Sequence, residues 1–100
     1  MSNSNEELAK ILSKYSKILT KEDLEELKLV FIETIYALKQ ELADEDVDWA
    51  KVPYPKSQNG VKFFEEICDL TISYKMDTEE IIGLDEGILS YLMYQYSIAK

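Results

Sequence analysis

The chain has 100 residues and a net charge of −9, with twenty acidic residues, eleven lysines and neither arginine nor histidine. This length has room for one hydrophobic core, so we expect a single domain over residues 1–100. Without histidine and with one cysteine, the chain has no Ser-His-Asp or Cys-His pair, no histidine-bound zinc and no internal disulfide. We also expect no direct nucleic-acid binding, because contact with phosphates needs a basic face.

The chain starts with neither the basic segment nor the apolar segment of a secretory signal. No apolar run approaches the length of a membrane span. A lone thiol without an export signal is typical of a reducing compartment. The sequence therefore predicts a cytoplasmic protein with no membrane span.

Apolar residues recur with helical spacing in four segments, which predicts an all-α fold. The predicted helices cover residues 5–19, 21–43, 61–74 and 78–97. Capping patterns mark three of their starts, namely Ser4 with Glu7, Thr20 with Asp23, and Asp77 with Glu80. We expect a compact bundle of about four helices with one long connection over residues 44–60.

The order in which these helices pack follows from the breaks between them. The break at Thr20 is very short, so we expect the first two helices to form an antiparallel hairpin. The second helix carries two apolar stripes, the second formed by Leu29, Ile32 and Tyr36. A helix that is apolar on two sides is typically central in its bundle.

The glycines and the end of the chain are compatible with more than one local structure. Gly60 is expected to end the long connection. Gly83 and Gly87 share one helix face, which favours either a close approach of another backbone or a kinked or broken helix. Residues 71–98 include β-prone positions, so one helix, two helices or a partial strand remain open there.

The 44–60 connection contains both prolines and the only tryptophan, and residues 41–50 contain five acids and no base. Asp44, Asp46 and Asp48 begin like a calcium loop, but Trp49 and Pro55 occupy the positions that need glycine and a bidentate glutamate. Paired glutamates elsewhere fall on helix exteriors or in first turns. We therefore expect no metal site, no cofactor and no enzymatic activity.

Aromatic residues in a proline-stiffened loop surrounded by acids are typical of a protein–protein hot spot. The predicted partner-binding surface consists of Asp44, Glu45, Asp46, Asp48, Trp49 and Tyr54. A second interpretation places Trp49 inside the bundle, between the second and third helices. The sequence leaves both open.

In size and helix count the chain resembles the bacteriocin immunity proteins. The string Val52–Pro55, followed after a short loop by residues 60–67, is similar to the acidic immunity proteins of nuclease colicins, over about twenty residues. In that family a tyrosine-rich segment ending in proline precedes the last helix and grips the toxin together with nearby acids. The resemblance implies Tyr54 as a contact. Pro53 and Tyr54 stand where the family has two tyrosines, the following loop is shorter, and some thirty further residues follow.

The sequence therefore predicts a non-catalytic protein-binding module, an immunity-type inhibitor that neutralises a basic toxin or enzyme. The expected partner is a protein with a basic surface. One alternative is a phage or mobile-element anti-defence inhibitor whose acids imitate nucleic acid. Another is a structural or regulatory subunit of a larger assembly, and a homodimer is left open.

Overall fold

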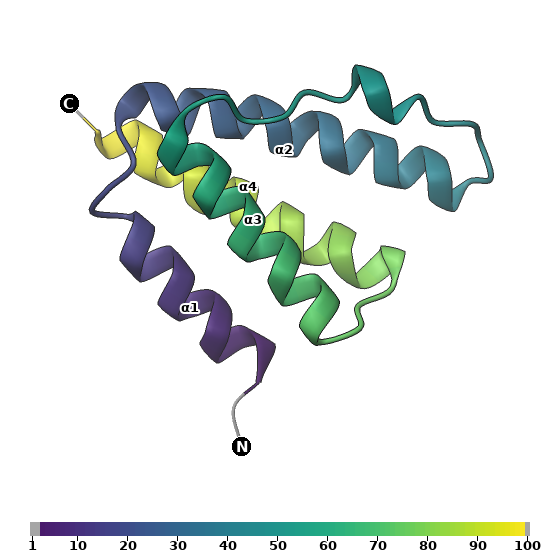
Figure 1. Cartoon of the computed structure of the whole chain (residues 1–100), viewed down its shortest axis with the longest axis horizontal. Helices are drawn as coiled ribbons and strands as arrows, with labels where there is room; N and C mark the ends of the chain where they lie inside the picture. Colours follow the sequence, from purple (N-terminus) through teal and green to yellow (C-terminus); the bar gives the residue numbers. More distant parts are fainter. Residues whose placement is uncertain (1–2, 100) are drawn as a thin grey trace.

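The computed structural model describes residues 3–99. They form four helices, which are α1 (Ser4–Tyr15), α2 (Lys21–Leu42), α3 (Gln58–Ser73) and α4 (Thr78–Ile98) (Figure 1). One short 3-10 helix, η1 (Trp49–Lys51), interrupts the connection between α2 and α3. The described range contains no strand. The predicted all-α bundle of about four helices is confirmed.

Two of the predicted capping boxes are present. The Thr20 hydroxyl accepts a hydrogen bond from the Asp23 N–H at 3.1 Å, and the Asp23 carboxylate accepts one from the Thr20 N–H at 3.0 Å. Asp77 and Glu80 make the same reciprocal pair at the start of α4, at 2.8 and 3.2 Å. Each box satisfies two backbone donors that the first helical turn leaves free.

The ends of α1 differ from the prediction. Asn3, rather than Ser4, caps the helix by accepting a hydrogen bond from the Glu6 N–H at 3.0 Å. The helix ends at Tyr15 rather than at residue 19, because the N–H groups of residues 18 and 19 both donate to the Tyr15 carbonyl. This tight turn carries Leu19 back against the core.

The start of α3 also lies earlier than predicted, at Gln58. Ser57 caps the helix by accepting a hydrogen bond from the Gly60 N–H at 3.1 Å, so Gly60 is buried in the first turn and does not end the connection. Glu26 on α2 fixes this corner, because its carboxylate accepts from the Lys56 N–H at 3.2 Å and the Ser57 N–H at 3.4 Å.

Gly60→Ala is expected to destabilise the protein by about 1–2 kcal/mol, since the new Cβ would lie 2.6 Å from the Ser57 Oγ and displace the cap. Gly87→Ala is the matched control, because a Cβ there meets nothing within 4 Å and should stabilise α4 by about 0.5–1 kcal/mol. Urea unfolding of both variants measures the difference. Equal effects in the two variants would contradict the proposed role of the cap.

The fourth helix is continuous through Gly83 and Gly87, so the helix is not broken there. Close approach of another backbone is not found either, because both glycines are exposed and an added Cβ meets no described atom within 4 Å. Residues 71–98 therefore hold the end of α3, a short turn and one helix. Apolar neighbours on α4 outweigh the β-prone side chains.

The helices pair differently from the prediction. α2 packs antiparallel on α4, and α1 packs on α3 (Figure 1). Lys39 of α2 forms a salt bridge with Glu86 of α4 at 3.3 Å, and Tyr91 of α4 donates a hydrogen bond to the Leu12 carbonyl at 3.0 Å. The predicted hairpin of the first two helices is wrong, because helical spacing defines an apolar face but not the helix that covers it.

Aromatic rings join α1, α2 and α3 at the centre of the core. The Phe63 ring lies edge-on to Tyr15 at 5.3 Å and to Phe31 at 6.2 Å, measured between centroids. The Tyr15 hydroxyl donates to Glu66, and burial followed by this bond raises the pKa of Tyr15 to about 12. Burial favours a higher pKa for Glu66, but hydrogen bonds from Tyr15 and Lys14 outweigh it and lower the pKa.

The second apolar stripe of α2 does not enter the core. Leu29, Ile32 and Tyr36 are exposed, and Val30, Phe31 and Ile35 between them are buried. The prediction that α2 is covered on both sides is therefore wrong. Its outer face leaves three large apolar side chains in contact with solvent.

Candidate functional site

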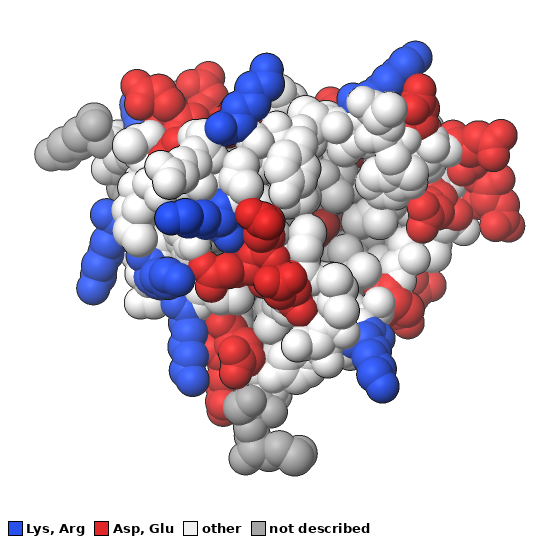
Figure 2. All heavy atoms as spheres, in the orientation of Figure 1, with Lys and Arg blue, Asp and Glu red and all other residues white. Residues whose placement is uncertain are grey.

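The connection between α2 and α3 begins with a reversal at Asp44, whose φ of 59° lies in the left-handed region. The Glu45 N–H closes the end of α2 by donating to the Gln40 carbonyl at 2.9 Å. The chain then runs back along α2 to Ser57 (Figure 1). The predicted acids therefore project together at the far end of α2, where acidic groups gather at the right-hand edge of Figure 2.

All four predicted acids are exposed, namely Asp44, Glu45, Asp46 and Asp48. Within residues 3–99 none of them takes part in a salt bridge, since the two ion pairs there join Lys14 to Glu66 and Lys39 to Glu86. Asp48 has a local role, because its carboxylate accepts from the Ala50 N–H at 3.2 Å and caps η1. The remaining acids leave a concentrated negative charge facing solvent.

The two predicted aromatic residues lie further along the connection. Trp49 is 44% exposed, and its Nε1 donates a hydrogen bond to the Glu41 carboxylate at 3.2 Å. Trp49 is therefore outside the core and does not fill the bundle between α2 and α3. Tyr54 is 54% exposed, and its ring packs edge-on against Phe64 at 5.3 Å.

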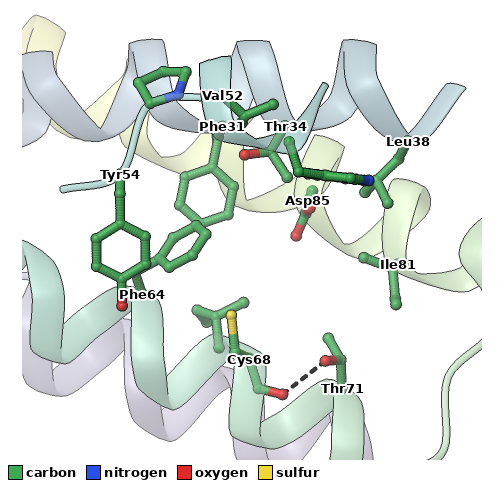
Figure 3. Close-up of a pocket in the computed structure, with 13 residues that line it drawn as sticks. Phe31, Thr34, Leu38, Val52, Tyr54, Phe64, Cys68, Thr71, Ile81 and Asp85 are labelled. Carbon is green, nitrogen blue, oxygen red and sulfur yellow. Dashed lines mark hydrogen bonds between the residues drawn. The ribbon is translucent and has the colours of Figure 1, made fainter. Parts of the chain in front are cut away.

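Beside these aromatic residues lies a cavity of about 330 Å³, bounded by the connection and by α2, α3 and α4 (Figure 3). Its walls are mainly apolar and aromatic. They include Phe31, Leu38, Trp49, Val52, Tyr54, Phe64, Ile67 and Ile81. The surface over this region is largely free of charged side chains and is hollowed (Figure 2).

Asp85 of α4 points into this cavity (Figure 3). It is only 4% exposed, and in the described part of the chain no hydrogen bond or ion pair engages its carboxyl group. Burial raises its pKa from 3.8 to about 7. No described side-chain oxygen is both fully enclosed and unpaired, so the Asp85 carboxyl meets the open space of the cavity rather than a protein partner. A largely buried carboxyl in this position among mainly apolar walls is the least expected feature of this fold.

The two threonine hydroxyls of the cavity already donate their protons to the backbone. The Thr34 hydroxyl donates to the Val30 carbonyl at 2.7 Å, and the Thr71 hydroxyl donates to the Cys68 carbonyl at 2.7 Å. Burial, followed by the negative charges of Asp85 and other acids, raises the pKa of the Cys68 thiol. Hydrogen-bond acceptors therefore predominate in the cavity, and the thiol is not activated as a nucleophile.

Sequence reasoning missed Asp85, although a signal was present. The residue follows Ile81 by four positions and precedes Ile88 by three, so it interrupts the apolar stripe of the last helix. An acid on a buried helix face carries a desolvation cost and is therefore unusual. The cavity itself has no signal in the sequence, because four separate segments enclose it.

A second hollow, of about 310 Å³, lies between α2 and the other side of the connection. Three acids line it, Glu33, Asp46 and Asp48, together with Lys51 and the exposed Tyr36. This acidic groove has the charge and the aromatic surface that a lysine or arginine side chain of a partner would contact.

None of the helices over residues 3–99 is both long enough and apolar enough to cross a membrane. Within the same range, histidine, cysteine and acidic side chains form no group of three or more that could hold a metal ion.

Comparisons with protein-family models, with curated proteins and with solved structures find no match to this chain. The resemblance to immunity proteins therefore stays a prediction. The acidic connection and the cavity beside it are the features of the molecule that bear on its function.

Proposed function

We propose that this chain is a non-catalytic protein that binds, and thereby inhibits, a partner protein with a basic surface, in the manner of an immunity protein. The observation that carries the proposal is the surface of the connection. Four exposed acids without ion-pair partners in the described chain precede the half-exposed Trp49 and Tyr54 on the same connection. Acids speed the encounter with a basic partner, and aromatic residues supply the area that is buried on docking.

The connection is held in one shape, which lowers the entropy cost of binding. Pro55 is buried, Trp49 is hydrogen-bonded to Glu41, and Glu26 fixes the far end of the connection. The acidic groove beside Tyr36 adds a place for a basic side chain. Imitation of nucleic acid is less well supported, because it needs acids spread along a face rather than gathered at one end.

The test compares two triple variants that each lose three charges. Asp44, Asp46 and Asp48 are changed to asparagine in one, and the matched control carries Glu22→Gln, Glu25→Gln and Asp69→Asn, at exposed positions outside the connection. A partner is captured from a lysate of the source organism with the wild-type protein and then purified. We expect the first variant to associate about tenfold more slowly and with weaker salt dependence, and the control to behave as wild type.

Trp49→Ala should weaken binding to the purified partner by about 2 kcal/mol or more. It should leave the melting temperature nearly unchanged, because the side chain lies outside the core. A purified partner whose binding rate and affinity are the same for all of these variants would overturn the proposal.

One observation favours a second candidate function, that of a subunit in a larger assembly. Leu29, Ile32 and Tyr36 form an exposed stripe along α2. Ile32 lies seven residues before Lys39, and Met93 lies seven after Glu86, so the Lys39–Glu86 bridge places exposed Met93 beside this stripe. Self-association that persists at high salt, measured by sedimentation, would support this candidate.

A further inference from the structure

We propose that the cavity containing Asp85 is a binding site for a small organic cation, a protonated amine carried on an apolar body. The cavity shares Trp49 and Tyr54 with the proposed partner-binding surface, but the inference rests on Asp85 and does not depend on the proposed function. It depends on three observations: a buried carboxyl aimed into the cavity, mainly apolar and aromatic walls, and a scarcity of free hydrogen-bond donors.

The hydrogen-bonding groups that line the cavity favour a ligand that donates hydrogen bonds. Thr34 and Thr71 give their hydroxyl protons to backbone carbonyls, so each offers only lone pairs to a ligand. No lysine lines the cavity, and Trp49 directs its N–H to Glu41, so the Tyr54 hydroxyl and the Cys68 thiol are the donors that its other walls supply. An ammonium group would therefore find acceptors around it and a carboxylate at Asp85, whereas an anionic ligand would find repulsion.

The apolar and aromatic walls favour a ligand in which the ammonium group is attached to an apolar body. Phe31, Phe64 and Tyr54 present rings, and Leu38 and Ile81 complete the apolar lining. Aromatic faces also attract organic cations. The volume of about 330 Å³ lies near the lower end of the range of roughly 300–1,000 Å³ that small-molecule pockets occupy. The site thus fits a compact arylalkyl amine better than a long chain.

The protonation of Asp85 supports this assignment. With a pKa near 7, the carboxyl of the free protein is about half protonated at neutral pH. The titratable groups that line the cavity with it are Cys68 on α3 and Tyr54 on the connection, while α2 contributes only Phe31, Thr34 and Leu38. A bound ammonium favours the ionised carboxylate, so binding should release a proton.

The experiment uses three probes of similar shape, 2-phenylethylamine, 2-phenylethanol and 3-phenylpropionate, with the full-length protein at pH 7. Trp49 is the only tryptophan and lines the cavity, so its fluorescence reports binding. We expect the amine to bind about tenfold more tightly than the alcohol, and the carboxylate not to bind. Calorimetry in buffers of different ionisation enthalpy should show the release of about half a proton per amine bound.

Asp85→Asn provides the matched variant, since it keeps the shape and removes the charge. It should bind amine and alcohol about equally and release no proton, with an unchanged far-UV circular dichroism spectrum. Three outcomes would overturn the proposal: no fluorescence change with the amine, equal affinity of wild type for all three probes, or the same amine affinity in Asp85→Asn. The probe comparison and the proton release use wild-type protein, so they decide the question even if the variant unfolds.

Discussion

Asp85→Leu is expected to raise the free energy of unfolding by about 2–4 kcal/mol at pH 8 and by much less at pH 4. Burial raises the pKa of this carboxyl from 3.8 to about 7, so the folded state favours the protonated form. Below about pH 4 the carboxyl is protonated in both the folded and the unfolded state, so its ionisation takes no stability from the protein. Stability is lost as the pH rises from there through 7, because the unfolded chain ionises this carboxyl more readily than the folded chain does. A rise of the pKa from 3.8 to about 7 corresponds to a loss of stability of about 4 kcal/mol at high pH, and contact of the carboxyl with water in the cavity reduces this loss.

Urea unfolding of wild type and variant between pH 4 and pH 8 measures this effect. The relevant quantity is the difference between the two proteins, because it removes the contribution of every titratable group that they share. Asp69→Leu, at an exposed position on α3, is the control and should show no pH-dependent gain. A constant difference between Asp85→Leu and wild type across the pH range would contradict the prediction.

Phe63→Ala should remove about 3–5 kcal/mol of stability, a large part of the total for a domain of this size. The Phe63 side chain is fully buried and touches rings from α1 and α2, so its loss leaves a void where three helices meet. Phe64→Ala is the control on the same helix. Phe64 is only partly buried and faces the cavity, so its loss should cost about 1–2 kcal/mol.

Circular dichroism during urea unfolding measures both variants, provided that the slope of the transition is unchanged. Similar losses for the two phenylalanines would mean that the core does not centre on Phe63. A loss at Phe64 that exceeds the loss at Phe63 would place the main packing contact in the cavity wall.

The positions of the helices were largely predictable because their signals are local. The Thr20 and Asp77 caps lie within four residues of the backbone groups that they satisfy, and periodicity marks each buried face. The early start of α3 depends on Ser57, a cap without an acidic partner three residues later. Which helices pack against one another was not predictable, because the apolar face of any of these helices can cover the apolar face of any other.

The candidate site also combines local features, which the sequence predicts, with contacts between distant segments, which it does not predict. Exposure of the acids at residues 44–48 follows from their local density, and the structure agrees. The position of Trp49 depends on Glu41 and on the cavity walls, which the sequence does not bring together. Asp85 was detectable as an acid on an apolar face, but its isolation became visible only with the surrounding helices in place.

The pairing of α1 with α3 and of α2 with α4 has a consequence for how the chain reaches its native state. Neither pair consists of neighbours in the sequence, and contacts such as Tyr91 with Leu12 span 79 residues. Native topology of this kind raises the contact order well above that of an up-and-down bundle. Individual helices form within microseconds, so we expect the search for these distant pairings, rather than helix formation, to limit the refolding rate.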